Sequence, residues 1–211
     1  MTMNPAEAAA LQRYGAELLE RSIAYALVAL QPVTPGALAR PTPCTGWDLG
    51  MLLAHFSDSL AALHEAVDTG TVGPPSGAAP PPPEGDPAAG CRSAAGRLVG
   101  AWTAAGRQDR LVTVGGCALR AGVVAGTGAI EIAVHGWDVA RALGERRAIP
   151  PSLAERLLRL APALVTGATR DRLFAPEMEQ PGNAPAGDRL LAFLGRDPGL
   201  VLPGEGWPGG L

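Results

Sequence analysis

One stretch of the chain combines an apolar sequence with three side chains that can do chemistry. Residues 121–140 read AGVVAGTGAIEIAVHGWDVA and contain Glu131, His135 and Asp138. At about 100° per residue, His135 lies about 40° and Asp138 about −20° from Glu131, so all three project from one narrow face of a helix. A carboxylate and an imidazole four residues apart on a buried face are what a helix offers a divalent metal. The same spacing also predicts a simple buried hydrogen-bonded pair, and a third ligand would decide between the two interpretations.

The third ligand has to come from a second helix. The chain has three histidines, and the two others are His55 and His64. They are nine residues apart, so they face opposite sides of a helix and at most one can join the site. Measured from the apolar stripe of this helix, His64 lies about 60° and His55 about 120° away, which mildly favours His64. Against this, His55 has Asp58 one turn further on as a hydrogen-bonding partner, so periodicity leaves the choice open.

The composition excludes several classes of protein. With 211 residues, 47% hydrophobic and 18% charged, the chain predicts one globular domain with a substantial core. All 17 basic residues are arginine, and the absence of lysine excludes a Walker-type phosphate loop, a pyridoxal Schiff base and a lysine nucleophile. There is no G-x-S-x-G elbow of the common serine hydrolases. The net charge of −3 and the lack of a basic block predict no nucleic-acid partner.

Cysteine spacing and the N-terminal residues indicate the compartment. Cys44, Cys91 and Cys117 are far apart and form no C-x-x-C pair, so neither a disulfide framework nor a zinc ribbon is predicted. The first residues carry several charges among apolar ones, which fits neither a signal peptide nor a membrane span. We therefore expect a cytoplasmic protein without a membrane partner.

Hydrophobic periodicity predicts an all-α fold built as one domain over 1–211. Proline residues predict an extended crossover over 31–44, after which Thr45 is the expected N-cap, with Asp48 completing a capping box. The insert at about 70–90 is rich in Pro and Gly and is expected to be a flexible linker that can be shortened at little cost in stability. Residues 111–120 predict a short hairpin or an extended connection. Helices are expected at about 5–30, 46–67, 87–106, 121–143, 151–166 and 188–194.

Four blocks of sequence together resemble a known family. They are PTPCTGW at 41–47, LLAHF at 52–56, EIAVHGWDVARALG at 131–144 and DRLLAFLGRDP at 188–198. They resemble the actinobacterial metal-binding relatives of mycothiol-dependent maleylpyruvate isomerase, within the DinB-like superfamily. The resemblance implies an up-down-up-down four-helix bundle of DinB type, with a long crossover after the first helix and short C-terminal helices. It also leaves a homodimer open, because DinB-like bundles often pair.

The resemblance assigns the metal ligands to His55, Glu131 and His135, and leaves His64 as a core or surface residue. Asp138 is then expected either to hydrogen-bond to a metal-binding residue and orient it, or to be an acidic residue on the same helix face. Two imidazoles and one carboxylate leave coordination positions open, as in catalytic sites; zinc is the first choice of metal, with Ni and Fe(II) as alternatives.

The remaining residues of the four blocks are expected to serve the fold more than the chemistry. Cys44 is expected to be an ordinary buried thiol, with substrate contact as the alternative. Trp47 and Trp137 are expected to pack and to line a pocket.

The activity implied by the resemblance is metal-dependent thiol chemistry on a small molecule. A low-molecular-weight thiol such as mycothiol would be activated by the metal and would add to an electrophilic substrate, as in a transferase or an isomerase. An arginine, Arg141 or Arg120, would anchor a substrate carboxylate. Two alternatives stay open: a thiol-independent metalloenzyme of specialised metabolism that catalyses hydrolysis, dehydration or rearrangement, and a non-catalytic metal-binding protein.

Overall fold

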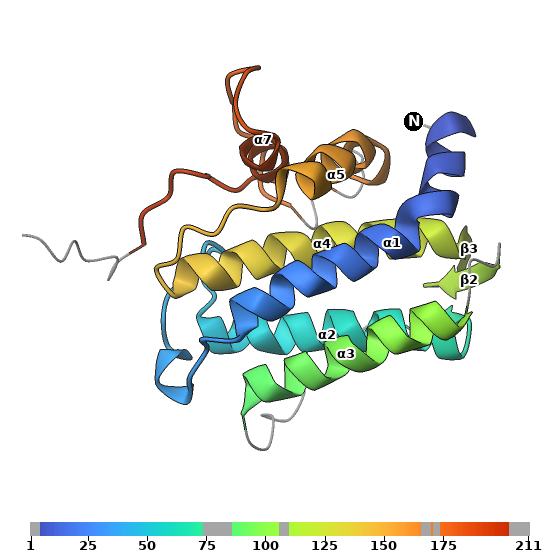
Figure 1. The fold of residues 1–211 in the computed structure, drawn as a ribbon, viewed down its shortest axis with the longest axis horizontal. Coiled ribbons are helices and arrows are strands. Elements are labelled where there is room, and N and C mark those ends of the chain that lie inside the picture. Colours follow the sequence, from blue (N-terminus) through green and yellow to red (C-terminus); the bar gives the residue numbers. More distant parts are fainter. Residues whose placement is uncertain (1–4, 74–85, 106–109, 166–169, 171–173, 203–211) are drawn as a thin grey trace, which may run out of the picture.

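The molecule is built mainly from helices (Figure 1). A computed structural model describes residues 5–73, 86–105, 110–165, 170 and 174–202. Within these residues the elements follow the predicted order, and the all-α prediction is confirmed. The helices are α1 (Pro5–Leu30), a 3-10 turn η1 (Pro35–Ala37), α2 (Leu49–Asp68), α3 (Pro87–Ala105), α4 (Ala121–Ala142), α5 (Pro151–Leu164) and α7 (Ala186–Phe193).

The four long helices pack on one another around a shared core. Helix α1 lies against α4 and α3, and α2 lies against α3 and α4. The predicted apolar stripe of α2 is buried, and it comprises Leu49, Leu52, Leu53, Phe56, Leu60, Leu63 and Val67. Helix α4 is buried along most of its length and contacts α1, α2 and α5, so a polar side chain on it lies among packed helices. The up-down-up-down order stays a prediction.

The start of α2 differs from the sequence prediction. The N-cap is Asp48, whose carboxylate accepts a hydrogen bond from the Met51 amide at 2.8 Å, and the helix begins at Leu49. The expected N-cap, Thr45, lies instead in a turn that the Trp47 amide closes by donating to the Cys44 carbonyl at 2.9 Å. Asp48 itself is extended and forms a bridge with Pro41, so the helix begins only after it, and its carboxylate caps the first turn. The crossover before it also contains η1 and is not extended throughout.

A small three-stranded sheet closes one end of the helices. The predicted hairpin is confirmed as β2 (Leu111–Val114) and β3 (Cys117–Arg120), joined by Gly115 and Gly116 at positive φ. Strand β1 (Thr71–Val72) pairs parallel with β2. The predicted flexible insert at about 70–90 was therefore too wide, because it includes β1 and the first turn of α3. Its central part, residues 74–85, lies outside the described residues.

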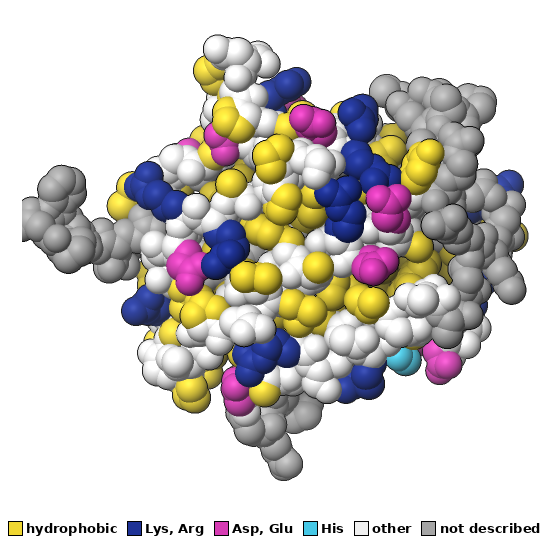
Figure 2. Space-filling view, viewed as in Figure 1, with side chains coloured by type: hydrophobic (Ala, Val, Ile, Leu, Met, Phe, Trp, Pro, Cys, Tyr) yellow, Lys and Arg dark blue, Asp and Glu magenta, His cyan; other side chains and the backbone are white. Residues whose placement is uncertain are grey.

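The C-terminal helices pack against the main group from one side. Helix α5 contacts α1 and α4, and α7 contacts α5. Basic and acidic side chains are interspersed on the face shown in Figure 2. Among the described residues, none of the helices combines the length and the hydropathy needed to cross a bilayer.

Candidate metal centre

Helix α4 presents Glu131, His135 and Asp138 together, as their spacing predicts. The Nε2 atom of His135 lies 3.2 Å from Oε1 of Glu131, one turn before it. The other ring nitrogen of His135, Nδ1, lies 2.9 Å from Oδ2 of Asp138. The imidazole is thus held between two carboxylates, with a different nitrogen directed at each.

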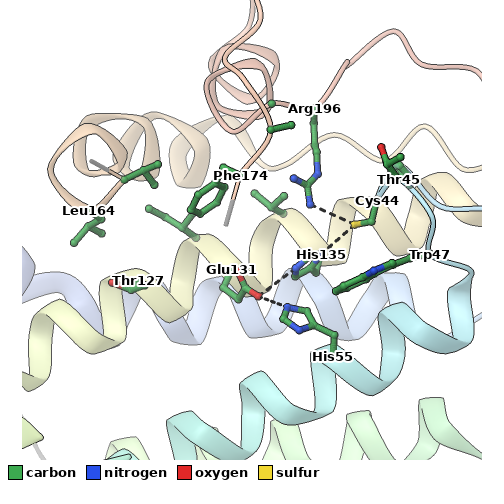
Figure 3. A pocket seen from close by; sticks show the side chains of 16 residues that line it. Cys44, Thr45, Trp47, His55, Thr127, Glu131, His135, Leu164, Phe174 and Arg196 are labelled. Atoms are coloured by element: carbon green, nitrogen blue, oxygen red, sulfur yellow. Dashed lines mark hydrogen bonds and ion pairs between the residues drawn. The ribbon is translucent and has the colours of Figure 1, made fainter. Parts of the chain in front are cut away.

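Helix α2 adds His55 to this group. Its Nε2 lies 2.7 Å from the same Oε1 of Glu131, and its ring meets the ring of His135 edge to face, with centroids 5.0 Å apart. The Ser59 hydroxyl, one turn further along α2, donates to this oxygen at 3.3 Å. One ligand atom each from His55, Glu131 and His135 lies within 4.8 Å of the others (Figure 3).

The structure places the second histidine of α2 elsewhere. His64 lines a separate hollow with Asp68 and Arg97. Asp58 is exposed, and the carboxylate that contacts His55 is Glu131. The mild preference of periodicity for His64 was misleading, because periodicity identifies side chains near the core. The His55 side chain is 39% exposed since it faces an open pocket beside the core.

Asp138 is fully buried and connects His135 to an arginine that sequence reasoning missed. Arg196 donates to Asp138 from Nη2 at 3.1 Å and from Nε at 3.4 Å. The Asp138 carboxylate accepts from Arg196, and a proton on Nδ1 of His135 would donate to the same carboxylate. Nε2 is thereby directed at Glu131, the arrangement by which carboxylates orient metal-binding histidines. The block that contains Arg196 was recognised in the sequence, but nothing local marks this arginine.

Cys44 belongs to the site, contrary to the expectation of an ordinary buried thiol. It is half-buried in the pocket wall, and its Sγ lies 3.3 Å from Oδ2 of Asp138 and 3.3 Å from Nη2 of Arg196. Cys44, His135 and Asp138 form a second group of potential ligand atoms that lie within 4.8 Å of one another. The Arg196 guanidinium lies against two members of this group, and its positive charge disfavours a cation there. The group of His55, Glu131 and His135 is therefore the better candidate.

The charges in the site compensate one another. Burial raises the pKa of Glu131, but the charge and hydrogen bonds of His135 and the hydrogen bond of His55 outweigh it and hold that pKa well below its usual value. Burial lowers the pKa of His135, and Glu131 and Asp138 outweigh this and raise it well above its usual value. Burial likewise raises the pKa of Asp138, but hydrogen bonding to His135 and the charge of Arg196 bring it below its usual value.

A pocket of about 720 Å³ is lined by Cys44, His55, Glu131 and His135, whereas Asp138 lies buried behind it. Among the described residues, Arg196 is the arginine in its wall, and the two that were expected to anchor a substrate lie elsewhere. Arg141 is buried, donates to the Leu200 carbonyl and lies over the Trp137 ring. Arg120 is exposed at the end of β3, directly before α4. Neither Arg120 nor Arg141 is among the described residues of the pocket lining, so the prediction of a substrate anchor at these positions was wrong. Their positions in the sequence do not indicate which direction their side chains take in the folded protein.

The two tryptophans divide the expected roles. Trp47 lines the pocket and meets the His55 ring edge to face, with centroids 5.0 Å apart. Trp137 is buried in the core, and its place among the core residues agrees with a packing role.

The fold and the site define a helical protein with a candidate divalent-metal centre between two helices. The chain belongs to the family of the mycothiol maleylpyruvate isomerase N-terminal domain, whose family model matches residues 19–140. It is similar to two uncharacterized proteins of Mycobacterium tuberculosis, MT0763 of strain CDC 1551 / Oshkosh and Rv0738 of strain ATCC 25618 / H37Rv. Each is 29% identical over 170 residues, which cover 79% of this chain and 89% of the relative. No solved structure matches the chain.

Proposed function

We propose that this protein is a divalent-metal-dependent enzyme that uses a thiolate on a small electrophilic substrate, as a thiol transferase or an isomerase. The main support is the convergence of His55, Glu131 and His135 within 4.8 Å on the wall of an open pocket. Membership of a family described by mycothiol and maleylpyruvate isomerase supports the thiol. The proposal places the reaction in the cytoplasm and has a small molecule as partner, without nucleic acid or membrane.

The residues present fit a divalent metal. Two imidazoles and one carboxylate are the donor set of many catalytic zinc sites, and they leave positions open for substrate. Nickel and iron(II) accept the same donors, so zinc is the first metal to test and not the only one. Asp138 supports the fit, because its contact with Nδ1 of His135 leaves Nε2 of that ring as the ligand atom.

A metal held there would supply a Lewis acid that polarises a carbonyl and lowers the pKa of a thiol such as that of mycothiol. The chain itself supplies positioning and charge. Trp47 packs against His55 and limits the motion of its ring, and Asp138 does the same for His135. Arg196 places a positive charge in the pocket wall, and a substrate carboxylate would form an ion pair with it. Addition of the thiolate, rotation and elimination would isomerise a double bond, and addition alone would transfer the thiol.

Elemental analysis of the purified protein tests the metal. We expect near-stoichiometric zinc, nickel or iron in the wild type after dialysis against a weak chelator. His55→Ala, Glu131→Ala and His135→Ala should each lose it, because each removes one of three ligands. His64→Ala is the matched control from the same helix and should retain it. Loss of metal in His64→Ala but not in His55→Ala would contradict the assignment.

Calorimetric titration with mycothiol tests the thiol. The metal-loaded wild type should bind mycothiol at least tenfold more tightly than S-methyl mycothiol, because only the free thiol can become a thiolate. His135→Ala should abolish this preference. A metal-loaded protein that does not distinguish the two ligands would contradict thiol chemistry and favour a thiol-independent metalloenzyme.

A further inference from the structure

One side of the pocket is apolar. Figure 3 shows Leu164 and Phe174 on one side of Glu131, with Cys44, Trp47 and Arg196 on the other. Two turns of α4 continue the apolar lining between them. The apolar residues that line the pocket are Ile130, Val134, Leu164, Val165, Phe174 and Ala175, apart from Pro43 and Trp47 beside Cys44.

The polar groups of the lining gather around the candidate metal ligands. Among the described residues, the charged or ionisable side chains of the pocket are Cys44, His55, Glu131, His135 and Arg196. Thr127 lies towards the apolar side, but its hydroxyl donates to the Val123 carbonyl of its own helix. Among the described residues that line the pocket, no charged side chain lies beside Phe174 to pair with a second charged group on a ligand, so desolvation of such a group would weaken binding.

The pocket as a whole is large enough to hold more than a small polar group. Thr127 and His135 are eight residues apart on α4 and both line the pocket, which corresponds to about 12 Å along the helix. A volume of about 720 Å³ lies in the range of pockets that enclose extended organic ligands. A compact dicarboxylic acid would leave most of this wall in contact with water.

We propose that the substrate is amphipathic, with one carboxylate or carbonyl at the cluster of His55, Glu131 and His135. Its apolar body, an alkyl chain or an aryl ring, lies against Ile130, Val134 and Phe174. This inference rests on the proposed function in one respect, namely that the polar group of the substrate lies at the metal ligands. Phe174 is the main specificity-determining residue, because its ring is the largest apolar group of this wall and is only half-buried without a ligand.

Calorimetric titration with octanoate and suberate tests the proposal. The two acids have the same chain length, but suberate carries a second carboxylate at the far end. We expect one octanoate per metal-loaded protein, bound at least tenfold more tightly than suberate. Binding should become tighter from butanoate to octanoate, with an increasingly negative heat-capacity change, because each added methylene buries apolar surface.

Variants of one side chain locate the binding. Phe174→Ala should weaken octanoate binding about five- to tenfold, and Phe174→Leu should restore most of it. Met178→Ala is the matched control, since Met178 is an exposed apolar residue outside the pocket lining. Equal binding of octanoate and suberate, no binding of either acid, or equal effects of Phe174→Ala and Met178→Ala would each overturn the inference.

The same titration in metal-free protein separates this inference from the proposed function. If the protein holds no metal, elemental analysis shows this directly and the proposed function fails. The preference for octanoate over suberate and its dependence on Phe174 should persist without metal, because the apolar wall is unchanged. If a metal-loaded protein shows neither the preference for octanoate nor its dependence on Phe174, the apolar subsite is contradicted and the proposed function is not.

Discussion

At the scale of single residues, Asp138 is the side chain on which the site depends most. It is fully buried, and it holds His135 on one side and Arg196 and Cys44 on the other. A buried carboxylate is costly to desolvate, so it is tolerated only where its neighbours compensate its charge. The pair with Arg196 therefore links the orientation of a metal ligand to a residue near the end of the described chain.

A double-mutant cycle tests this pair. Asp138→Asn and Arg196→Met should each lower the free energy of unfolding by about 3 kcal/mol, because each leaves one charge buried without its partner. The double variant should cost clearly less than the sum of the two, since it leaves no unpaired charge. Urea denaturation of the four proteins measures the coupling. Strictly additive effects would show that Arg196 does not stabilise Asp138.

At the scale of elements, small residues allow α4 to lie close to its neighbours. A Cβ atom on Gly15 of α1 would overlap the Gly122 carbonyl of α4. A Cβ atom on Gly136 would lie 3.0 Å from the backbone of Ala26, also in α1. On the other side, a Cβ atom on Gly128 would lie 2.5 Å from the Leu63 side chain of α2. This close approach of α2 and α4, one turn before Glu131, is what brings His55 within reach of that carboxylate.

Two glycine-to-alanine variants separate packing from helix propensity. Gly15→Ala should lower the free energy of unfolding by about 1–3 kcal/mol, because the added methyl group forces α1 away from α4. Gly100→Ala, in α3 with open space around the site of the new methyl group, should be neutral or should stabilise by up to about 1 kcal/mol. Thermal and urea unfolding of both variants measure the difference. Equal effects at the two positions would contradict a close contact at Gly15.

At the scale of the whole molecule, the site is assembled from two parts of the chain. The three candidate ligands and Asp138 lie within residues 19–140, the part matched by the family model. Leu164, Phe174 and Arg196 lie after it, and they complete the pocket from the side of α5 and α7. The part matched by the family model thus contains the candidate metal ligands. The C-terminal part adds Leu164, Phe174 and Arg196, which under our proposals contribute to substrate specificity.

None of these site residues comes from the segment 74–85, and its Pro- and Gly-rich sequence predicts that it contributes little to stability. Removal of half of it should change the free energy of unfolding by no more than about 1 kcal/mol, because halving a loop changes its closure entropy by only about 0.6 kcal/mol. A matched deletion of Thr71 and Val72 should cost more, since it removes the pairing of β1 with β2. Equal losses in the two deletions, measured by thermal unfolding, would contradict the prediction.

The sequence by itself determined the helices and the grouping of Glu131, His135 and Asp138 on one helix face. Both follow from a repeat of 3.6 residues, which is a local property of the chain. Local signals also predicted an extended segment or hairpin over 111–120 and the end of α4 to within one residue. Where two local signals competed, as for the N-cap of α2, the bridge between Pro41 and Asp48 decided, and it forms only when the crossover folds back.

Only the tertiary structure decided which side chains meet. Periodicity mildly favoured His64, family resemblance indicated His55, and the packing of α2 on α4 is what brings His55 to Glu131. Arg196 lies 58 residues after Asp138 in the chain, and no local pattern predicts a contact over that separation. The apolar wall at Phe174 is equally non-local. Such contacts depend on how helices pack, and the hydrophobic effect that drives packing has no direction and leaves no periodic signal for a single pair.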